Sequence, residues 1–513
     1  MLARCSGAAL LGLEAVEVAV EVDIAPGLPG LQMVGLADTA VQESRERVRA
    51  ALRNSGLQMP LTRVIVNLAP ADLRKEGPAF DLPIALALLA ASGQLDPAAL
   101  QGLWSAGELG LDGRLRPLRG AVALALAARR CGARALLLPQ ANAAEAALVE
   151  GLSIWPAESL RHGLALIHDP SLAASPRCRA EPAHPTASPD LAELQGQAHG
   201  RRALEIAAVG GHHLLLVGPP GSGKTLLARN LPGLLPPLSR SEALELSQIY
   251  SVAGLLLGQS AGLQQRPFRA PHHSCSGAAL VGGGSLPRPG ELALAHRGVL
   301  FLDELAEFRR DVLNQLRQPL EEGEIWVQRA RQQLRFPCLI SLVAATNPCP
   351  CGWYGDPERA CRCGTGQRLR YWSKLSGPLL DRMDLQVVVR RLEASTLGRS
   401  LRGQPDQAAE PTASVARRVR RAHARMQRRN GGTANSRLSQ RQLRELGQFE
   451  PMALDLWQRA IAQRCLSARS GERLLRVARS IADLEGQTAV GPAAMAEALC
   501  YRSFDPELQE RCG

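Results

Sequence analysis

The chain has 513 residues, of which 46% are hydrophobic and 21% charged, a composition typical of a soluble globular protein with two to four domains. It contains no run of about 18 uncharged apolar residues, which excludes a membrane-spanning helix, and its net charge of +12 favours polyanionic partners. Because Glu14, Glu17 and Glu21 interrupt the apolar N-terminus, no signal peptide is expected, so we expect a cytoplasmic protein with reduced thiols and no disulfide framework.

The N-terminal segment predicts a half-buried β-strand. Residues 15–24, AVEVAVEVDI, alternate between apolar and polar side chains. A period of two places every second side chain on the same face of a strand. The side chains of that face are Val16, Val18, Val20, Val22 and Ile24.

The same N-terminal part resembles the peptidase domain of Lon. The segment KEGPAFDLPIALALLAASGQL is similar to the Lon segment with the nucleophilic serine, and GELGLDGRLRPLRGAVALALAARRCGARALLLP is similar to the segment with the catalytic lysine. The resemblance places Ala79 at the serine position and Val122 at the lysine position. An alanine methyl cannot attack a carbonyl and a valine cannot activate a nucleophile. We therefore expect the fold without its protease chemistry.

Two segments have the composition of linkers. Residues 169–189 are rich in Pro, Ala and Ser and lack an apolar period, and residues 403–414 form a shorter break. They divide the chain into an N-terminal domain, a central α/β block and a C-terminal helical block, at residues 1–168, 190–402 and 415–513.

The central block alternates predicted strands and helices. The segments HHLLLVG, GVLFLDE and CLISLVAATN are short apolar runs that end in glycine or polar residues. Alternation of strands with helices predicts a mainly parallel sheet that is covered on both faces.

A phosphate-binding motif follows the first of these strands. GPPGSGKT matches G-x-x-x-x-G-K-[ST] and lies between a predicted strand and a predicted helix. Its glycines let backbone N–H groups surround phosphate oxygens, and the helix N-terminus adds the positive end of its dipole. Lys224 is expected to contact the β and γ phosphates of ATP and Thr225 to bind Mg²⁺. The predicted nucleotide-binding residues are Gly218, Pro219, Pro220, Gly221, Ser222, Gly223, Lys224 and Thr225.

The next two strands each end in polar residues of the same predicted site. Asp303 and Glu304 follow VLFL. Asp303 is expected to position Mg²⁺ and Glu304 to polarise the attacking water. Asn347 ends the following strand, where its side chain can sense the γ-phosphate.

Four cysteines follow Asn347 within fifteen residues, in two Cys-x-Cys pairs. In a reducing compartment the alternatives are a structural zinc ion held by four thiolates, four free thiols, or redox chemistry. The Gly- and Pro-containing loop between the pairs allows a tight turn, so a zinc staple that braces the Asn347 region is expected. Its ligands are Cys349, Cys351, Cys361 and Cys363.

Residues 190–395 resemble the AAA+ module of the magnesium-chelatase-like ATPases. The segments that carry this resemblance are GPPGSGKT, PGELALAHRGVLFLDEL, AATNPCPCG and SGPLLDRMD, and similarity to the ComM/YifB family extends over nearly the whole chain. The resemblance implies a homo-oligomeric ring, expected to be a hexamer, with active sites between subunits. It also implies that Arg382 is the arginine finger and that Arg469 is a sensor on a helical lid.

Two basic segments are candidates for contact with DNA. LEEGEIWVQRARQQLRFP resembles the hairpin that faces the ring pore in related motors, so Arg329 and Arg331 are candidates; a plain surface hairpin is the alternative. Residues 417–429 contain seven arginines and no acid. They belong to a predicted helix whose apolar stripe is Val415, Val419, Ala422 and Met426.

The arginines on the other faces of that helix are expected to bind phosphates without sequence preference, although a solvated surface is the usual interpretation of a charge run. The candidates are Arg417, Arg421, Arg425 and Arg428.

The expected fold class is α/β, with a Lon-protease-like N-terminal domain that lacks the catalytic dyad, an AAA+ P-loop core with a parallel sheet, and a C-terminal helical lid. By resemblance, the expected function is an ATP-hydrolysing ring motor on single-stranded or branched DNA, which migrates branch points while imported DNA is integrated during natural transformation. The alternative is a chelatase-type or protein-remodelling ATPase that acts on a protein partner. An active protease is disfavoured by Ala79 and Val122.

Overall fold

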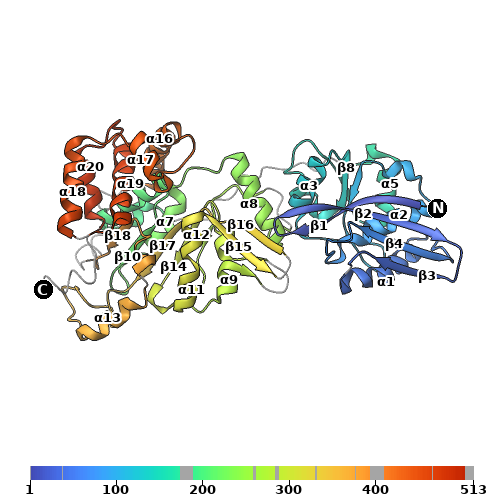
Figure 1. Cartoon of the computed structure of the whole chain (residues 1–513), viewed down its shortest axis with the longest axis horizontal. Helices are drawn as coiled ribbons and strands as arrows, with labels where there is room; N and C mark the ends of the chain where they lie inside the picture. Colours follow the sequence, from blue (N-terminus) through green and yellow to red (C-terminus); the bar gives the residue numbers. More distant parts are fainter. Residues whose placement is uncertain are drawn as a thin grey trace.

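The computed structural model places the N-terminal domain at one end, the α/β block in the middle and the helical block at the far end (Figure 1). None of the helices within the part of the chain that the structure describes is long and apolar enough to cross a membrane. The described residues are 2–36, 38–173, 189–257, 262–283, 288–329, 332–375, 377–392, 410–464 and 466–502. Most of the predicted linker 169–189 lies outside them.

The N-terminal domain is built on a seven-stranded sheet with the order β3-β4-β2-β1-β5-β8-β9. The predicted alternation of residues 15–24 is confirmed, because Val18, Val20 and Val22 are fully buried on one face of β2. The strands are β1 Leu2–Leu11, β2 Glu14–Ala25, β3 Gly30–Val34, β4 Arg63–Ala69, β5 Leu103–Ser105, β8 Ala135–Pro139 and β9 Ser153–Ala157. The helices of this domain are α1 Thr39–Asn54, α2 Asp81–Ala91, α3 Ala121–Arg130, α4 Ala143–Ala146 and α5 Leu160–His168, and a short hairpin joins β6 Glu108–Leu109 to β7 Leu115–Arg116.

Helix α3 packs against α8 (Arg240–Ala253) of the central block. Val122, which the sequence analysis placed at the lysine position of Lon, is fully buried, and its N–H donates to Ser251 Oγ at 3.2 Å. The N–H of Gly120 donates to Ser251 O at 3.0 Å. The segment that resembles the lysine-containing segment of Lon therefore supports the contact between the two domains here.

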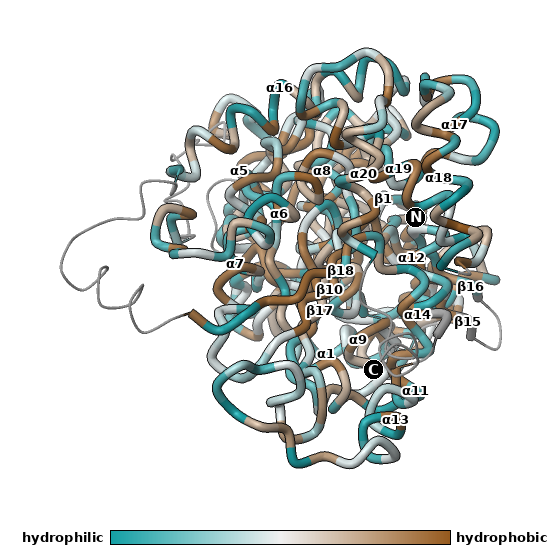
Figure 2. Tube along the Cα trace, turned by 90° about the vertical axis from the view of Figure 1, so that its left-hand side faces the viewer, coloured by the Kyte–Doolittle hydropathy of each residue, from teal (hydrophilic) through white to brown (hydrophobic). Residues whose placement is uncertain are grey.

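The central sheet is parallel and has the order β11-β14-β17-β10-β18. The three predicted strands are confirmed as β10, β14 and β17, and all their residues are buried. In Figure 2, β10, β17 and β18 are drawn as hydrophobic tubes inside the molecule. Burial on both faces explains their continuous apolar runs. The strands are β10 Leu214–Val217, β11 Phe268–Arg269, β14 Val299–Leu302, β17 Ser341–Thr346 and β18 Leu385–Val388.

Helices and two hairpins surround this sheet. The hairpins pair β12 Gly282–Gly283 with β13 Arg288–Pro289, and β15 Glu324–Arg329 with β16 Gln332–Pro337. Besides α8, the helices are α6 Ala198–Gly210, α7 Lys224–Leu234, α9 Gly277–Val281, α10 Glu291–Leu294, α11 Arg310–Gln315, α12 Arg317–Glu322, α13 Thr365–Ser373 and α14 Gly377–Leu380.

The C-terminal block is helical, and α19 packs against α20, α16 and α6. Helix α16 begins at Thr412, inside the span predicted as a linker. Pro411 precedes it, and Asp190 Oδ1 accepts the N–H of Thr412 at 2.8 Å, which satisfies a free donor of the first turn. Its predicted apolar stripe is buried. The helices are α16 Thr412–Asn430, α17 Gln440–Leu446, α18 Pro451–Arg464, α19 Ala468–Leu484 and α20 Pro492–Cys500.

Candidate nucleotide site

The phosphate-binding motif forms the turn between β10 and α7, as predicted. Gly218 has to be glycine, because a Cβ there would lie 2.2 Å from Val389 O. Gly223 has a φ of +90° and is the N-cap of α7, so it turns the chain into the helix with a backbone that other residues rarely adopt. The result is a tight, glycine-containing turn directly before a helix N-terminus, which is a site for phosphate.

Lys224 lies in this loop and connects it to the neighbouring strand. Its Nζ donates to Gly218 O at 2.6 Å, to Pro219 O at 2.9 Å and to Asn347 Oδ1 at 3.3 Å. Burial lowers the pKa of Lys224, while Asp303 and Glu304 act in the opposite direction. The structure thus brings the predicted phosphate-binding lysine and the predicted γ-phosphate sensor into contact.

Thr225 and Asp303, the two predicted Mg²⁺ ligands, also meet. The hydroxyl of Thr225 donates to Asp303 Oδ2 at 2.9 Å. Hard oxygen ligands of this kind, together with phosphate oxygens, are how proteins hold Mg²⁺. The loop, the lysine and this pair together fit a nucleoside triphosphate with its magnesium ion.

Glu304 occupies the turn directly after β14. Its backbone has φ 51° and ψ 47°, an uncommon conformation for a residue with a side chain, and its N–H donates to Asp303 Oδ1 at 3.0 Å. Such conformations concentrate at functional sites. Its Oε2 lies 3.4 Å from Nδ1 of His273, a residue that the sequence analysis missed. His273 follows β11, and no motif in the sequence connects it with Glu304.

A cavity of about 820 Å³ adjoins the loop, and its lining includes residues that the sequence analysis missed. Gln197 precedes α6 and donates through Nε2 to Arg390 O at 2.5 Å and to Ser222 O at 3.3 Å. It therefore connects the phosphate loop to the segment after β18. The wall of the cavity includes Gly218, Pro219, Val389 and the loop residues Tyr354 to Pro357.

Arg382, the predicted arginine finger, is largely buried and pairs with Glu321 of α12 in the same chain. Its carbonyl accepts from Arg473 Nη1 at 3.1 Å. Arg469, the predicted lid sensor, is exposed in the first turn of α19, one turn before Arg473. The sequence analysis did not single out Arg473, which connects the lid to the chain beside Arg382.

Arg473 also pairs with Asp384, whose side chain is fully buried, at 2.6 Å. Nδ1 of His212 lies 3.3 Å from the other carboxylate oxygen of Asp384. Burial by itself raises the pKa of Asp384, but Arg473 and His212 outweigh burial and hold that pKa far below its usual range. The lid is therefore connected to the core by an ionised carboxylate.

The two groups of DNA candidates differ in what the structure describes. Arg329 belongs to β15, whose hairpin partner is β16, whereas Arg331 lies outside the described residues. On α16, a groove of about 400 Å³ is lined by Ser414, Arg417, Arg418, Arg421, Arg425 and Leu484.

The arginines of α16 are not all available for phosphate. Arg418 pairs with Glu205 of α6 at 2.7 Å, and Arg429 pairs with Asp483 of α19 at 2.9 Å. Acidic residues distant in the sequence thus neutralise two of the seven arginines in residues 417–429. The sequence analysis did not predict these ion pairs, because it considered only the acids within that segment. Arg425 donates to Asp483 O at 2.9 Å. Among the described residues, Arg417, Arg421 and Arg428 are exposed and have no ion-pair partner.

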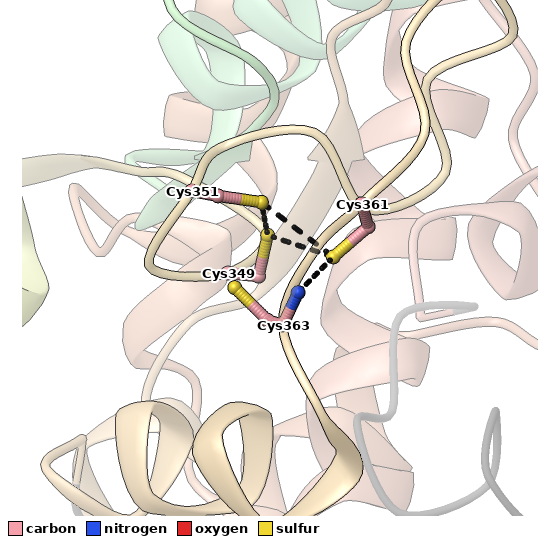
Figure 3. Close-up of side chains that lie close together, drawn as sticks. All are labelled: Cys349, Cys351, Cys361 and Cys363. Atoms are coloured by element: carbon pink, nitrogen blue, oxygen red, sulfur yellow. Dashed lines mark hydrogen bonds between the residues drawn. The ribbon is translucent and has the colours of Figure 1, made fainter.

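The four predicted metal ligands come together in the loop after β17 (Figure 3). Their Sγ atoms all lie within 4.8 Å of one another. Cys349 Sγ is 3.3 Å from Cys351 Sγ and 3.6 Å from Cys361 Sγ, so the atoms are too far apart for a disulfide bond. The four thiols fit a tetrahedral metal site.

A P-loop between β10 and α7, an acid pair after β14 of the same parallel sheet and a helical lid define an AAA+ ATPase fold of the magnesium chelatase type. Three segments of the chain match families of the magnesium chelatase subunit ChlI. Residues 190–397 match the family described as magnesium chelatase, subunit ChlI, and residues 20–142 match the family described as subunit ChlI of Mg-chelatase. Residues 409–502 match the C-terminal family of the same subunit.

Relatives that are similar over nearly the whole chain define a narrower family. YifB of Salmonella typhimurium is 44% identical over 497 residues, 97% of this chain and 96% of that protein. Competence protein ComM of Haemophilus influenzae is 41% identical over 506 residues, 98% of this chain and 97% of that protein. The chain therefore belongs to the YifB/ComM family of magnesium-chelatase-like AAA+ proteins.

The N-terminal domain has a weaker similarity to a protease. Lon protease 2 of Bacillus subtilis is 30% identical over 152 residues, which are 27% of this chain and 26% of that protein. Ala79 lies just before α2, and its carbonyl accepts from the N–H of Gly107 at 2.9 Å. The absence of protease activity stays a prediction from Ala79 and Val122.

Proposed function

We propose that this chain is an ATP-hydrolysing ring motor that acts on DNA and moves branch points while imported DNA is integrated. One observation supports the proposal of ATPase activity: the phosphate loop, the Thr225–Asp303 pair and the Lys224–Asn347 contact lie together at one edge of the sheet. These side chains come from three different strand ends, and their meeting is what ATP with Mg²⁺ requires.

Each residue of the site has a role in the hydrolysis of ATP. Lys224 would contact the β and γ phosphates, and Thr225 and Asp303 would hold Mg²⁺, which when bound would supply positive charge to the phosphate oxygens. Glu304 orients and polarises the attacking water, and Asn347 contacts the γ-phosphate. The lid arginine Arg469 completes the site from α19.

The ring is proposed from the family and from Arg382. A finger that reaches a neighbour's γ-phosphate has to leave Glu321, its partner within the chain. The breaking of that ion pair on assembly would connect subunit contact to catalysis. We propose a homohexamer.

DNA is proposed as the substrate because of the basic surfaces. Arg417 and Arg421 line one groove on α16 and have no ion-pair partner among the described residues. Arginines that bind phosphate act without sequence preference and release counterions. The pore hairpin with Arg329 and Arg331 would supply further contacts. The H. influenzae relative has competence in its name, which agrees with a role in handling imported DNA.

A chelatase-type or protein-remodelling ATPase is the second candidate. The observation that favours it is the match to the magnesium chelatase ChlI subunit along most of the chain. In that case the moved partner would be a protein, and the arginines of α16 would be a solvated surface.

One experiment separates the two candidates: steady-state ATP hydrolysis by the full chain with no DNA, with single-stranded DNA and with branched DNA. The motor on DNA predicts faster turnover with DNA, and Lys224→Ala gives the background rate. If DNA neither binds at moderate salt nor changes the turnover of an active ATPase, the protein-remodelling candidate replaces the motor.

A further inference from the structure

The segment between β17 and α13, residues 347–364, contains no helix or strand. A structureless segment of this length in a compact domain needs fixed points to hold one conformation. Two contacts fix its ends: Trp372 Nε1 donates to Pro348 O at 3.0 Å, and Arg368 Nη1 donates to Cys363 O at 3.0 Å. The four cysteines lie within this stretch, and the last of them, Cys363, accepts the second contact.

The distances between the four sulfur atoms are those of ligands around one metal ion and are too long for disulfide bonds. Tetrahedral zinc with bonds of about 2.3 Å places its sulfur ligands about 3.8 Å apart. Cys361 Sγ lies 3.6 Å from both Cys349 Sγ and Cys351 Sγ, close to that value. Figure 3 shows the side chains converging from both ends of the loop. Thiolate ligands select zinc or iron over magnesium.

The same loop is a wall of the cavity beside the phosphate loop. Tyr354, Gly355, Asp356 and Pro357 line this cavity of about 820 Å³ together with Gly218 and Pro219. Because Tyr354 to Pro357 lie between Cys351 and Cys361, the position of this wall depends on whether the two Cys-x-Cys pairs are held together.

One contact joins the loop directly to the phosphate-binding motif. Gly352 has a φ of +82°, and a Cβ there would lie 2.7 Å from Cδ of Pro220. Gly352 also follows Cys351, one of the four sulfur ligands. A shift of that cysteine would therefore move the surface against which Pro220 packs.

We propose that the four cysteines bind one zinc ion and that this ion controls nucleotide affinity by fixing the wall of the nucleotide cavity. The inference rests on the proposed function in that ATP binds beside the phosphate loop. The metal takes no part in hydrolysis, because its four ligands leave no open position. Loss of the metal frees residues 352–360, and nucleotide binding then has to order them.

The expected effect follows from that ordering. Ordering a mobile segment lowers the affinity for the ligand that the segment contacts, so metal loss is expected to weaken nucleotide binding about tenfold.

The test uses the full chain, purified without chelators. Elemental analysis is expected to find one zinc per chain. The dissociation constant of a fluorescent ATP analogue is then measured with Mg²⁺ before zinc removal by a chelator, after it, and after return of one equivalent of zinc. The Cys361→Ser variant supplies a metal-free form if the ion resists the chelator. The Cys131→Ser variant, at an exposed cysteine outside the cluster, is the control.

A second variant tests the effect of the wall's position on nucleotide binding while the metal stays bound. Gly352→Ala is expected to keep its zinc and to bind nucleotide more weakly, because the new methyl group displaces the loop from Pro220. Gly431→Ala controls for backbone strain, since Gly431 has a φ of +60°, lies on the lid and has open space around its Cβ position.

Each outcome has a distinct meaning. A metal-loaded chain that does not bind nucleotide contradicts the proposed function. A chain that binds nucleotide equally well with and without zinc overturns this inference alone. No zinc in the purified chain and none bound on addition, or iron in its place, overturns the metal assignment.

Discussion

Replacing Glu304 by glutamine tests the assignment of the group that polarises water. The Glu304 side chain is 57% exposed and contacts His273 at 3.4 Å, while Lys224 and Thr225 bind elsewhere in the site. Glutamine has the same shape, so the phosphate loop and the Mg²⁺ ligands stay in place. An exposed substitution of this kind changes stability by about 0.5 kcal/mol or less.

The expected decrease in the rate of ATP hydrolysis is the contribution of a general base. Positioned acids and bases contribute about 10²- to 10⁴-fold, which corresponds to about 2.7–5.5 kcal/mol of activation free energy. Glu304→Gln should therefore hydrolyse ATP at least about a hundredfold more slowly and bind it with unchanged affinity. Phosphate release and titration with a fluorescent ATP analogue measure the two quantities.

Glu307→Gln is the matched control, because Glu307 is also exposed and belongs to the short 3-10 helix Leu305–Glu307 that directly follows Glu304. Its Oε2 is 4.0 Å from Lys374 Nζ. It should hydrolyse ATP at the wild-type rate. A Glu304→Gln variant that hydrolyses ATP at the wild-type rate would refute the assignment of Glu304 as the group that polarises water. A variant that no longer binds ATP would show that Glu304 supports the phosphate loop itself.

Three further changes test other parts of the site. Arg382→Ala should abolish hydrolysis in a uniform ring and recover part of it when mixed with Lys224→Ala subunits, since a finger acts on its neighbour; mixed rings without any recovery would place its action within its own subunit. Asp384→Ala should lower the free energy of unfolding by about 1–3 kcal/mol, because the buried N–H of His213 loses its acceptor and Arg473, which is 17% exposed, loses its carboxylate; an unchanged thermal unfolding curve would contradict this. Glutamine at the four candidate positions of α16 should flatten the salt dependence of DNA binding by about 0.9 in log–log slope per lost phosphate contact, on all sequences alike, whereas Arg441→Gln, at another exposed arginine, should leave the slope unchanged; the four positions are Arg417, Arg421, Arg425 and Arg428.

The fold elements that could be predicted from the sequence are those with local signals. The alternation of residues 15–24 and the apolar runs of β10, β14 and β17 follow from burial on one or both faces of a sheet. The glycines of the phosphate loop are also a local signal, because the turn before α7 needs their backbone freedom.

The contacts that could not be predicted join segments far apart in the chain. His273 reaches Glu304 from the end of another strand, and Asp384 finds Arg473 on the lid. The acids that pair with Arg418 and Arg429 come from α6 and α19. No periodicity within a segment carries such information, because the partner is chosen by the packing of the whole chain.

The position of Val122 shows the same limit. The resemblance to Lon predicts that Val122 replaces a catalytic lysine, which says nothing of what Val122 does in this chain. The structure places it in the contact of α3 with α8, where its N–H bonds to Ser251. Its packing gives the residue a structural role that no comparison of motifs could show.

The most direct test of a motor on DNA is a labelled four-way junction incubated with the full chain, Mg²⁺ and ATP. The account predicts that the wild-type protein converts the junction to duplex products only when ATP is present, and that the Lys224→Ala protein leaves it intact. A junction that stays intact with wild-type protein that binds it and hydrolyses ATP would contradict the account.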